Sequence, residues 1–162
     1  MNATFPHAPD NYYLKWWRRL APFPGGARLF SLLLGWMVPY SASIGPLVET
    51  LESGKVRVSL RDRRKLRNHL KSIHAIALIN LGEIATGLAV MTCLPDNMRG
   101  IVLGLQAEYL KKARGKLVAS VCLELPEEIE DNTAFDVSAE IIDEAGEVVA
   151  IVRANWLLGY KQ

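Results

Sequence analysis

The spacing of apolar residues divides the chain into segments with two different periods. The pattern over residues 12–38 predicts two short helices with a break at 22–26, where prolines lack an N–H donor and glycines loosen the backbone. From Leu47 the period changes to two: Val56, Val58 and Leu60 alternate with polar neighbours, which is typical of a half-buried strand. With residues 47–51 and the turn at 52–55, this strand predicts a β-hairpin.

One long apolar segment, residues 73–94, exceeds the length of an ordinary strand and is rich in Ala, Leu and Ile. It predicts a helix that ends before Pro95. Between residues 75 and 90 the main polar interruptions are Asn80, Glu83 and Thr86. A helix that is apolar on nearly every side has to be surrounded by protein, so we expect this helix at the centre of the domain. We expect Asn80 to be a buried amide with its hydrogen bonds satisfied.

Four further strands are predicted by alternation or apolar runs over residues 101–109, 117–125, 135–141 and 147–158. Short connections among them, including an expected hairpin at Lys111 to Lys116, indicate an antiparallel sheet that curls around the central helix. The fold class is therefore α+β, with a helical extension at residues 1–46 and the sheet-and-helix domain at residues 47–162. One helix cannot cover both faces of six strands, so pairing with a second copy is expected.

Composition narrows the class of protein. The 162 residues suffice for one domain, and 19 Lys and Arg against 17 Asp and Glu are too balanced for a protein that coats nucleic acid. Cys93 and Cys122 lie in apolar runs, which favours buried thiols in a reducing compartment, so a cytoplasmic location is expected. The three histidines, His7, His69 and His74, do not have chelating spacing, so no metal and no resident cofactor is predicted.

The N-terminal segment leaves two interpretations open. Residues 1–10 are polar and lack the apolar core of a secretory signal. The apolar residues 29–38 cover about 15 Å as a helix, half of a hydrocarbon core, so they cannot span it. Trp16 and Trp17 beside Arg18 and Arg19 have the composition of a lipid-interface segment. Alternatively, both short helices pack their apolar sides onto the domain.

A spaced set of polar residues connects the chain to a known family. The motif Asn68-x5-His74-Ala75-x7-Glu83 begins in a loop after the second strand and runs into the central helix. It resembles the motif of hotdog-fold acyl-CoA thioesterases of the phenylacetyl-CoA thioesterase type, and the chain is also similar to an uncharacterised branch of that superfamily. The resemblance extends from about Val48 to Tyr160. It implies a hotdog fold, in which a curved antiparallel sheet of about six strands wraps around one long helix, and hydrolysis of an acyl-CoA thioester.

Each motif residue has a chemical role that the resemblance implies. The Ala75 N–H, at the helix start, can stabilise the oxyanion on the acyl carbonyl, with alanine standing where the family has glycine. Asn68 donates to the same carbonyl or orders the loop, and His74 orients the loop or touches the thioester. Glu83 is the candidate base or nucleophile, since burial in an apolar helix raises a carboxyl pKa. The structural alternative is that Glu83 caps backbone or pairs with Arg153.

Helix geometry adds a requirement for a second chain. Ala75 and Glu83 are eight residues apart, about 12 Å along a helix, so one carbonyl cannot contact the Ala75 N–H and also be attacked by Glu83 of the same helix. We therefore expect a homodimer, or a dimer of dimers, in which each site combines Ala75 of one chain with Glu83 of the other.

Two basic clusters lie near the motif. Cations of this kind suit the phosphates of coenzyme A, which enters as part of the substrate. The alternatives are a solvated loop and a weak nucleic-acid or lipid-headgroup patch; interleaved aromatic residues that would favour nucleic acid are missing from these runs. The expected coenzyme A contacts are Arg63, Arg64, Lys65, Lys111, Lys112 and Arg114.

Two other functions remain open at this stage. A related hotdog activity, hydration or dehydration of an acyl thioester, calls for histidine and aspartate together on the substrate, and residues 73–94 contain no aspartate. The second is a non-catalytic module that binds acyl-CoA or fatty acid and is membrane-associated through its N-terminal segment, because one fold hosts many functions.

Overall fold

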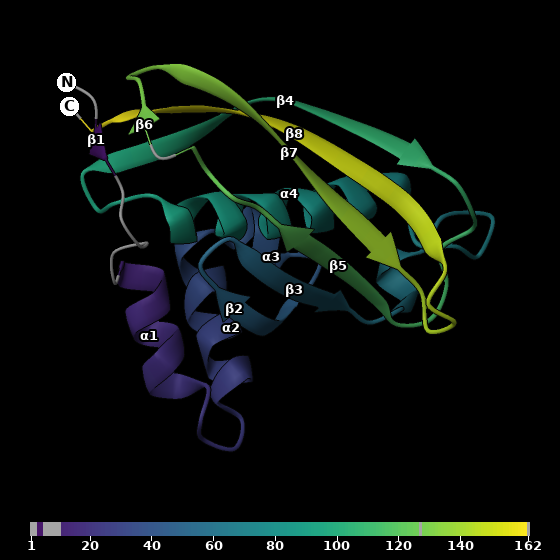
Figure 1. Cartoon of the computed structure of the whole chain (residues 1–162). Coiled ribbons are helices and arrows are strands. Elements are labelled where there is room, and N and C mark those ends of the chain that lie inside the picture. The colour runs from purple at the N-terminus through teal and green to yellow at the C-terminus, as the bar shows by residue number, and fades with distance from the viewer. Residues whose placement is uncertain (1–2, 5–10, 127, 162) are drawn as a thin grey trace.

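The structure is a computed structural model that describes residues 3–4, 11–126 and 128–161. Six strands form one antiparallel sheet in the order β2-β3-β5-β7-β8-β4, with a separate two-stranded pairing of β1 and β6. The sheet curves over the long helix α4, and helices α1, α2 and α3 lie on the other side of α4 (Figure 1). The element bounds are β1 Ala3–Thr4, α1 Tyr12–Leu20, α2 Gly26–Met37, α3 Pro39–Ala42, β2 Leu47–Glu52, β3 Lys55–Leu60, α4 Ala75–Cys93, β4 Met98–Tyr109, β5 Leu117–Cys122, β6 Glu128–Ile129, β7 Thr133–Ile142 and β8 Val148–Tyr160. The predicted α+β class and the sheet wrapped around one helix are confirmed.

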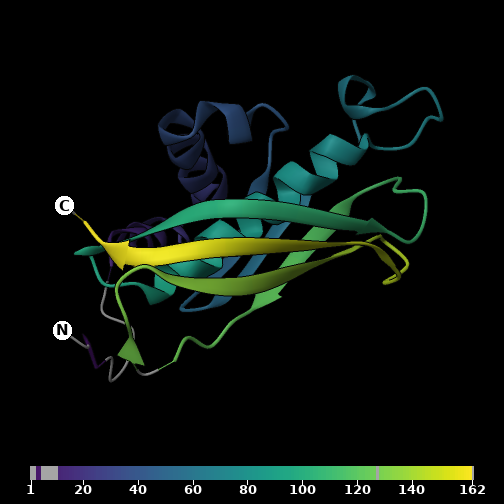
Figure 2. The same ribbon diagram turned by 90° about the horizontal axis from the view of Figure 1, so that it is seen from above.

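Helix α4 is the centre of the fold, as its all-round apolarity predicts. It crosses beneath the long strands β4, β8 and β7 on a diagonal (Figure 2). Gly82 lets it approach the sheet closely, because a Cβ there would lie 2.3 Å from Cβ of Val152 on β8. Its length and apolarity would also suffice to cross a membrane, but 67% of that stretch is buried inside the protein. The apolar surface of α4 is therefore covered by the sheet.

The ends of α4 follow local sequence chemistry. His74 is the N-cap, and its Nδ1 accepts a hydrogen bond from the Ile76 N–H at 3.2 Å. The helix ends at Cys93, next to the extended residue Leu94 and the helix-breaking Pro95. The helix predicted over residues 73–94 is thus confirmed to within two residues at each end.

The expected hairpin between the strands now called β4 and β5 is wrong. β4 pairs with β8 at one edge of the sheet, whereas β5 lies between β3 and β7. The intervening residues instead pass the start of α4, where the Ile73 N–H donates to the Ala113 carbonyl at 2.8 Å. Strand alternation indicates which residues form strands but not which strands pair, and here the connection crosses from one edge to the interior of the sheet.

Strand β4 is an edge strand whose apolar side chains are largely exposed. Its unpaired long edge carries Ile101, Leu103 and Leu105 with exposed fractions of 45%, 56% and 41%. The period-two pattern had predicted one buried face for this strand. Helix α4 packs against β4 as well as against β3, β7 and β8, but it leaves these three side chains exposed.

The N-terminal helices are connected to the sheet and to α4 at specific points. Asn11 caps α1 and its amide donates to the Met91 carbonyl near the end of α4. On α2, the Ser31 hydroxyl accepts the Val48 N–H of β2 at 2.9 Å. The two predicted helices are confirmed, and a third, short helix, α3, follows directly at Pro39, which starts a helix as readily as it ends one.

The cysteine prediction holds only in part. Both Cys93 and Cys122 are free thiols, as expected, but Cys122 is exposed and Cys93 is only partly buried. Cys122 ends β5 on the outer face, where its alternation places it away from the helix. His7 lies outside the described residues.

Candidate active site

The start of α4 forms one half of a candidate site. As the first residue of the helix, Ala75 has a backbone N–H with no intrahelical acceptor, and no acceptor is recorded for it within the described part of the chain. Ala75 lines a cavity of about 330 Å³, together with Asn68, Tyr109 and Lys112. The helix dipole makes this end favourable for negative charge. The cavity thus offers a free donor where an oxyanion would be stabilised.

Asn68 orders the loop in front of that donor. Its Oδ1 accepts hydrogen bonds from the N–H groups of Leu70 at 2.9 Å and Ser72 at 3.2 Å. This fixes the amide plane and leaves Nδ2, the donor end, for a ligand in the same cavity. Both roles considered for Asn68 are therefore compatible, because they use opposite ends of one amide.

His74 acts as the cap of α4 rather than as a free imidazole. Nδ1 is occupied by the Ile76 N–H, so the neutral ring carries its proton on Nε2. The residue is exposed, and its side chain fixes the helix start that presents the Ala75 N–H. Of the roles considered for His74, orienting the loop is the one that this geometry supports.

Glu83 lies in a second, separate cavity. This cavity measures about 130 Å³, and its mostly apolar lining includes Tyr13, Leu34, Met91 and Trp156. Burial raises the Glu83 carboxyl pKa above its ordinary value, and a hydrogen bond from the Ser41 hydroxyl at 3.4 Å opposes that shift. The carboxylate is therefore poised to hold or accept a proton nearer neutral pH than an exposed glutamate.

The proposed ion pair of Glu83 with Arg153 does not form. Arg153 faces Glu108 instead, at 3.4 Å, across the outer face of β8 and β4. Ser41 is the polar contact recorded for the Glu83 side chain among the described residues, so the structural alternative of a charge-neutralising bridge is wrong. The neighbouring Asn80 is buried, as expected, and it is not among the residues whose buried polar atoms lack a hydrogen-bond partner in the described part of the chain.

The two cavities do not merge within one chain. Ala75 and Asn68 line the cavity at the start of α4, whereas Glu83 lines the one beneath α2 and α3. The eight residues between Ala75 and Glu83 separate them by about 12 Å along α4. One chain therefore carries both chemical parts of the motif but does not bring them to one point.

The six basic residues are divided between different surroundings. Lys111 and Lys112 line the cavity at the start of α4, and Arg114 donates to the Leu70 carbonyl of its rim at 3.5 Å. Lys111 is also paired with Asp143 and Glu147 on the far side. In the basic cluster that precedes the motif, Arg64 begins the 3-10 turn Arg64–Leu66, close in sequence to Asn68.

Arg63 and Lys65 hold the chain rather than an open cavity. The Arg63 guanidinium donates to the carbonyls of Ile44 and Gly45, and Lys65 Nζ donates to the Ser43 carbonyl at 3.1 Å. These bonds fasten the segment between α3 and β2. The structure therefore brings Lys111, Lys112 and Arg114 to the start of α4 and directs Arg63 and Lys65 to backbone acceptors.

Several contacts in these cavities could not be predicted from the sequence. Ser41 comes from a four-residue helix and Tyr13 from the first helix, both more than forty residues from Glu83. Tyr109 ends β4, and its hydroxyl donates to the Ala75 carbonyl at 3.3 Å. Each is brought in by packing between distant segments, which periodicity does not reveal. The described residues contain no cluster of metal-ligating side chains.

The sheet wrapped around a buried central helix, with a polar motif at the helix start and a carboxylate midway along it, defines the hotdog class. The chain belongs to the family described as "Domain of unknown function (DUF4442)", whose match covers residues 26–158. A comparison with curated proteins gave no match.

Solved structures share this fold. The chain is similar to a crystal structure named genomics APC5556, with 25% identity over 93% of this chain and all of that one and a TM-score of 0.79. A thioesterase enzyme from Staphylococcus aureus has 16% identity, coverage of 75% and 98%, and a TM-score of 0.65. A phenylacetic acid degradation protein from Thermus thermophilus has 20% identity, coverage of 74% and 97%, and a TM-score of 0.62. At these identities the latter two establish a common fold.

Proposed function

We propose that the protein is an acyl-CoA thioesterase, which hydrolyses an acyl-CoA thioester to a free acid and coenzyme A. The observation that carries the proposal is Glu83, a carboxylate midway along a buried helix and next to a small apolar cavity. Burial raises its pKa, and no cation among the described residues is paired with it. Burying a charged carboxylate lowers the stability of the fold, but its raised pKa makes it useful as a base. The fold shared with a thioesterase enzyme from Staphylococcus aureus supports the same reaction class.

In the proposed reaction the thioester carbonyl oxygen accepts hydrogen bonds from the Ala75 N–H and the Asn68 amide. Glu83 of the partner subunit takes a proton from a water molecule, whose oxygen attacks the carbonyl carbon. The tetrahedral intermediate expels the coenzyme A thiolate, which receives the proton that Glu83 holds. The acyl group becomes a free carboxylic acid, so the atoms balance with water as the second substrate.

The proposal includes a homodimer, because Ala75 and Glu83 of one chain line different cavities. The exposed edge of β4 supports it. A strand edge with unpaired backbone groups and apolar side chains invites a partner, and antiparallel pairing of two β4 strands around a two-fold axis would reverse the direction of the second α4. Reversed helices bring the start of one toward the middle of the other.

The phosphates of coenzyme A are proposed to lie on the rim of the cavity at the start of α4. Lys112 and Arg114 are both exposed beside this cavity, and Arg64 precedes the motif loop in the sequence. Arg63 and Lys65 are not part of this proposal, because their donors are used by backbone carbonyls. Substituting Lys112 and Arg114 with glutamine should therefore raise KM and leave kcat nearly unchanged.

The test is release of free thiol from a panel of short, aryl and long acyl-CoA esters, with Glu83→Gln assayed beside the wild-type protein. Loss of a general base should lower kcat by about a hundredfold or more while acyl-CoA binding persists. If no ester is turned over but acyl-CoA still binds, the non-catalytic binding module replaces the enzyme. Full activity of Glu83→Gln would remove the carboxylate from the mechanism.

A further inference from the structure

Helices α1 and α2 present an apolar surface that the domain does not cover. They lie on the side of α4 away from the sheet (Figure 1). Trp36 and Leu32 on α2 have exposed fractions of 86% and 72%, and Phe23 in the turn between the two helices has 68%. These fractions are higher than those of the apolar side chains on the edge strand β4. Of the two interpretations that the sequence left open, packing on the domain accounts for the inner side of these helices, where Leu14 and Phe30 are buried. It does not account for the outer side.

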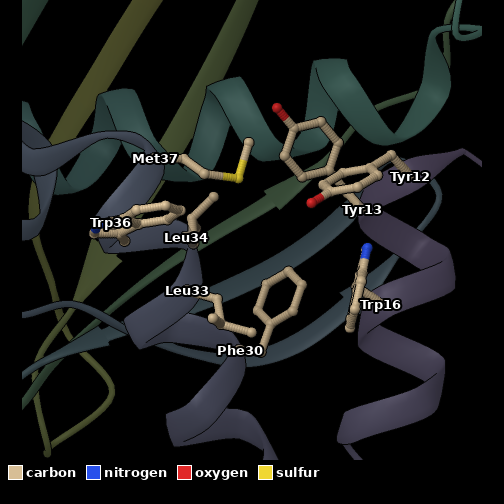
Figure 3. A pocket seen from close by; sticks show the side chains of 8 residues that line it. All are labelled: Tyr12, Tyr13, Trp16, Phe30, Leu33, Leu34, Trp36 and Met37. Atoms are coloured by element: carbon tan, nitrogen blue, oxygen red, sulfur yellow. The ribbon is translucent and has the colours of Figure 1, made fainter.

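A groove runs between the two helices. It measures about 160 Å³ and is lined by aromatic and aliphatic side chains from both helices, which point toward one another (Figure 3). Tyr12 and Trp16 form the wall on α1, and Leu33, Trp36 and Met37 lie on α2. A groove with this lining accepts hydrocarbon rather than polar groups.

The charged residues of α1 and α2 all have one sign. Between residues 11 and 48 the chain has four cations and no Asp or Glu, although the whole chain is nearly balanced. Arg19 lies over the Trp16 ring, 6.0 Å from its centroid. On the other side of α2, Arg28 and Arg61 line a depression of about 720 Å³ together with Leu32 and Trp36. Apolar and aromatic side chains are thus surrounded by guanidinium groups.

The charge decides between two occupants of the surface. A second copy that contacted the same surface around a two-fold axis would set cations against cations, which is unfavourable. An anionic lipid surface offers phosphates to the arginines and hydrocarbon to the apolar side chains at the same time. Tryptophan, tyrosine and arginine at the boundary between water and hydrocarbon are characteristic of such contacts.

We propose that α1 and α2 dock the protein onto a membrane surface that contains anionic phospholipids. At 12 residues α2 is about 18 Å long, so it lies along the surface instead of crossing it. Leu32, Trp36 and the groove residues enter the boundary of the acyl chains, and Arg19, Arg28 and Arg61 contact headgroup phosphates. The docking does not depend on the proposed thioester hydrolysis.

The experiment is flotation of the full chain with vesicles of phosphatidylcholine alone and of phosphatidylcholine mixed with phosphatidylglycerol. The wild-type protein should float with the anionic vesicles, and less so at high salt, since screening weakens headgroup contacts. The double variant Leu32→Ser, Trp36→Ser should bind these vesicles more weakly, by about tenfold at least. The matched variant Leu32→Met, Trp36→Phe, which keeps the same positions apolar, should retain binding.

The contribution of charge to vesicle binding is tested by the same substitution, arginine to glutamine, at two positions. Arg28→Gln should weaken binding to the anionic vesicles on the order of fivefold. Arg57→Gln, an exposed arginine on β3, should leave it unchanged. Circular dichroism and thermal midpoints establish that each variant is folded.

Two results would overturn the proposal. One is absence of flotation with both vesicle types, or flotation that the serine variant does not reduce. The other is that the serine variant dissociates a wild-type oligomer in sedimentation while vesicles bind neither protein, which would assign the surface to a second copy of the chain. Thioester hydrolysis, measured on soluble substrate, reports on the proposed activity independently of either result.

Discussion

Glu83 shows how one residue can be unfavourable for the fold and suited to a reaction. Burial among apolar side chains raises its pKa, and the single hydroxyl of Ser41 opposes the shift only in part. Because the folded state binds this proton more tightly than the unfolded state, the contribution of Glu83 to stability is greatest at acid pH. It is lost as the pH rises from the ordinary glutamate value of 4.5 through the folded-state pKa.

Replacing the charge should therefore stabilise the protein. We expect Glu83→Gln to raise the free energy of unfolding at pH 7 and to lose this advantage below the ordinary value of 4.5, where wild-type Glu83 is protonated in both states. Urea unfolding of both proteins across this pH range measures the difference. An advantage that is independent of pH would mean that the carboxylate is not desolvated.

The hydroxyl of Ser41 should tune the same carboxylate. Its hydrogen bond favours the charged form, so Ser41→Ala should raise the Glu83 pKa further. The acid limb of the pH profile of kcat/KM should then move to higher pH, because the base is deprotonated over a narrower range. An unshifted profile would show that a different group controls that limb.

The Ala75 N–H can be removed without disturbing the helix. Proline is favoured at the first helical position, and His74 already has the extended backbone that a following proline requires. We expect Ala75→Pro to fold normally and to lose about a hundredfold or more in kcat, since one oxyanion donor is gone. Ala75→Gly, which keeps the N–H, is the control and should remain active.

At the scale of elements, β4 is the strand whose exposed side chains most need a partner. Introducing lysines at Leu103 and Leu105 places like charges opposite one another if two β4 strands pair. We expect this double variant to be a folded monomer without thioesterase activity. Cys122→Lys adds one lysine at an exposed position of the interior strand β5 and should leave the oligomeric mass and the activity unchanged. Sedimentation and thiol release measure both.

At the scale of the whole molecule, a site built from two chains predicts that two inactive variants can restore activity in a mixed dimer. A site within one chain does not predict this. In a mixed dimer of Glu83→Gln and Ala75→Pro chains, one site carries both defects and the other carries none. Random mixing of two inactive proteins should therefore restore about a quarter of the wild-type activity, since half the dimers are mixed and each has one intact site of two. Co-expression with distinct tags followed by thiol assay tests it, and no recovery would place each site within one chain.

The parts of the fold that could be predicted are those with a local cause. Alternation placed the strands, all-round apolarity placed α4 at the centre, and motif spacing singled out Asn68, Ala75 and Glu83. The misplaced hairpin after β4 has a different origin, because the choice of pairing partner depends on segments far away in the sequence. The same holds for Ser41, which a four-residue helix delivers to Glu83 across more than forty residues.

By itself, the sequence determined that one apolar helix is wrapped by a sheet and carries a carboxylate eight residues beyond its first donor, because side-chain periodicity and helix rise are properties of the local chain. Tertiary structure alone decided that β4 lies at an exposed edge, that the Ser41 hydroxyl lies beside the carboxylate, and that the N-terminal helices turn aromatic side chains outward. These outcomes depend on which segments, far apart in the sequence, pack against one another. When one side of a helix or strand is buried in such a contact, its other side is left exposed.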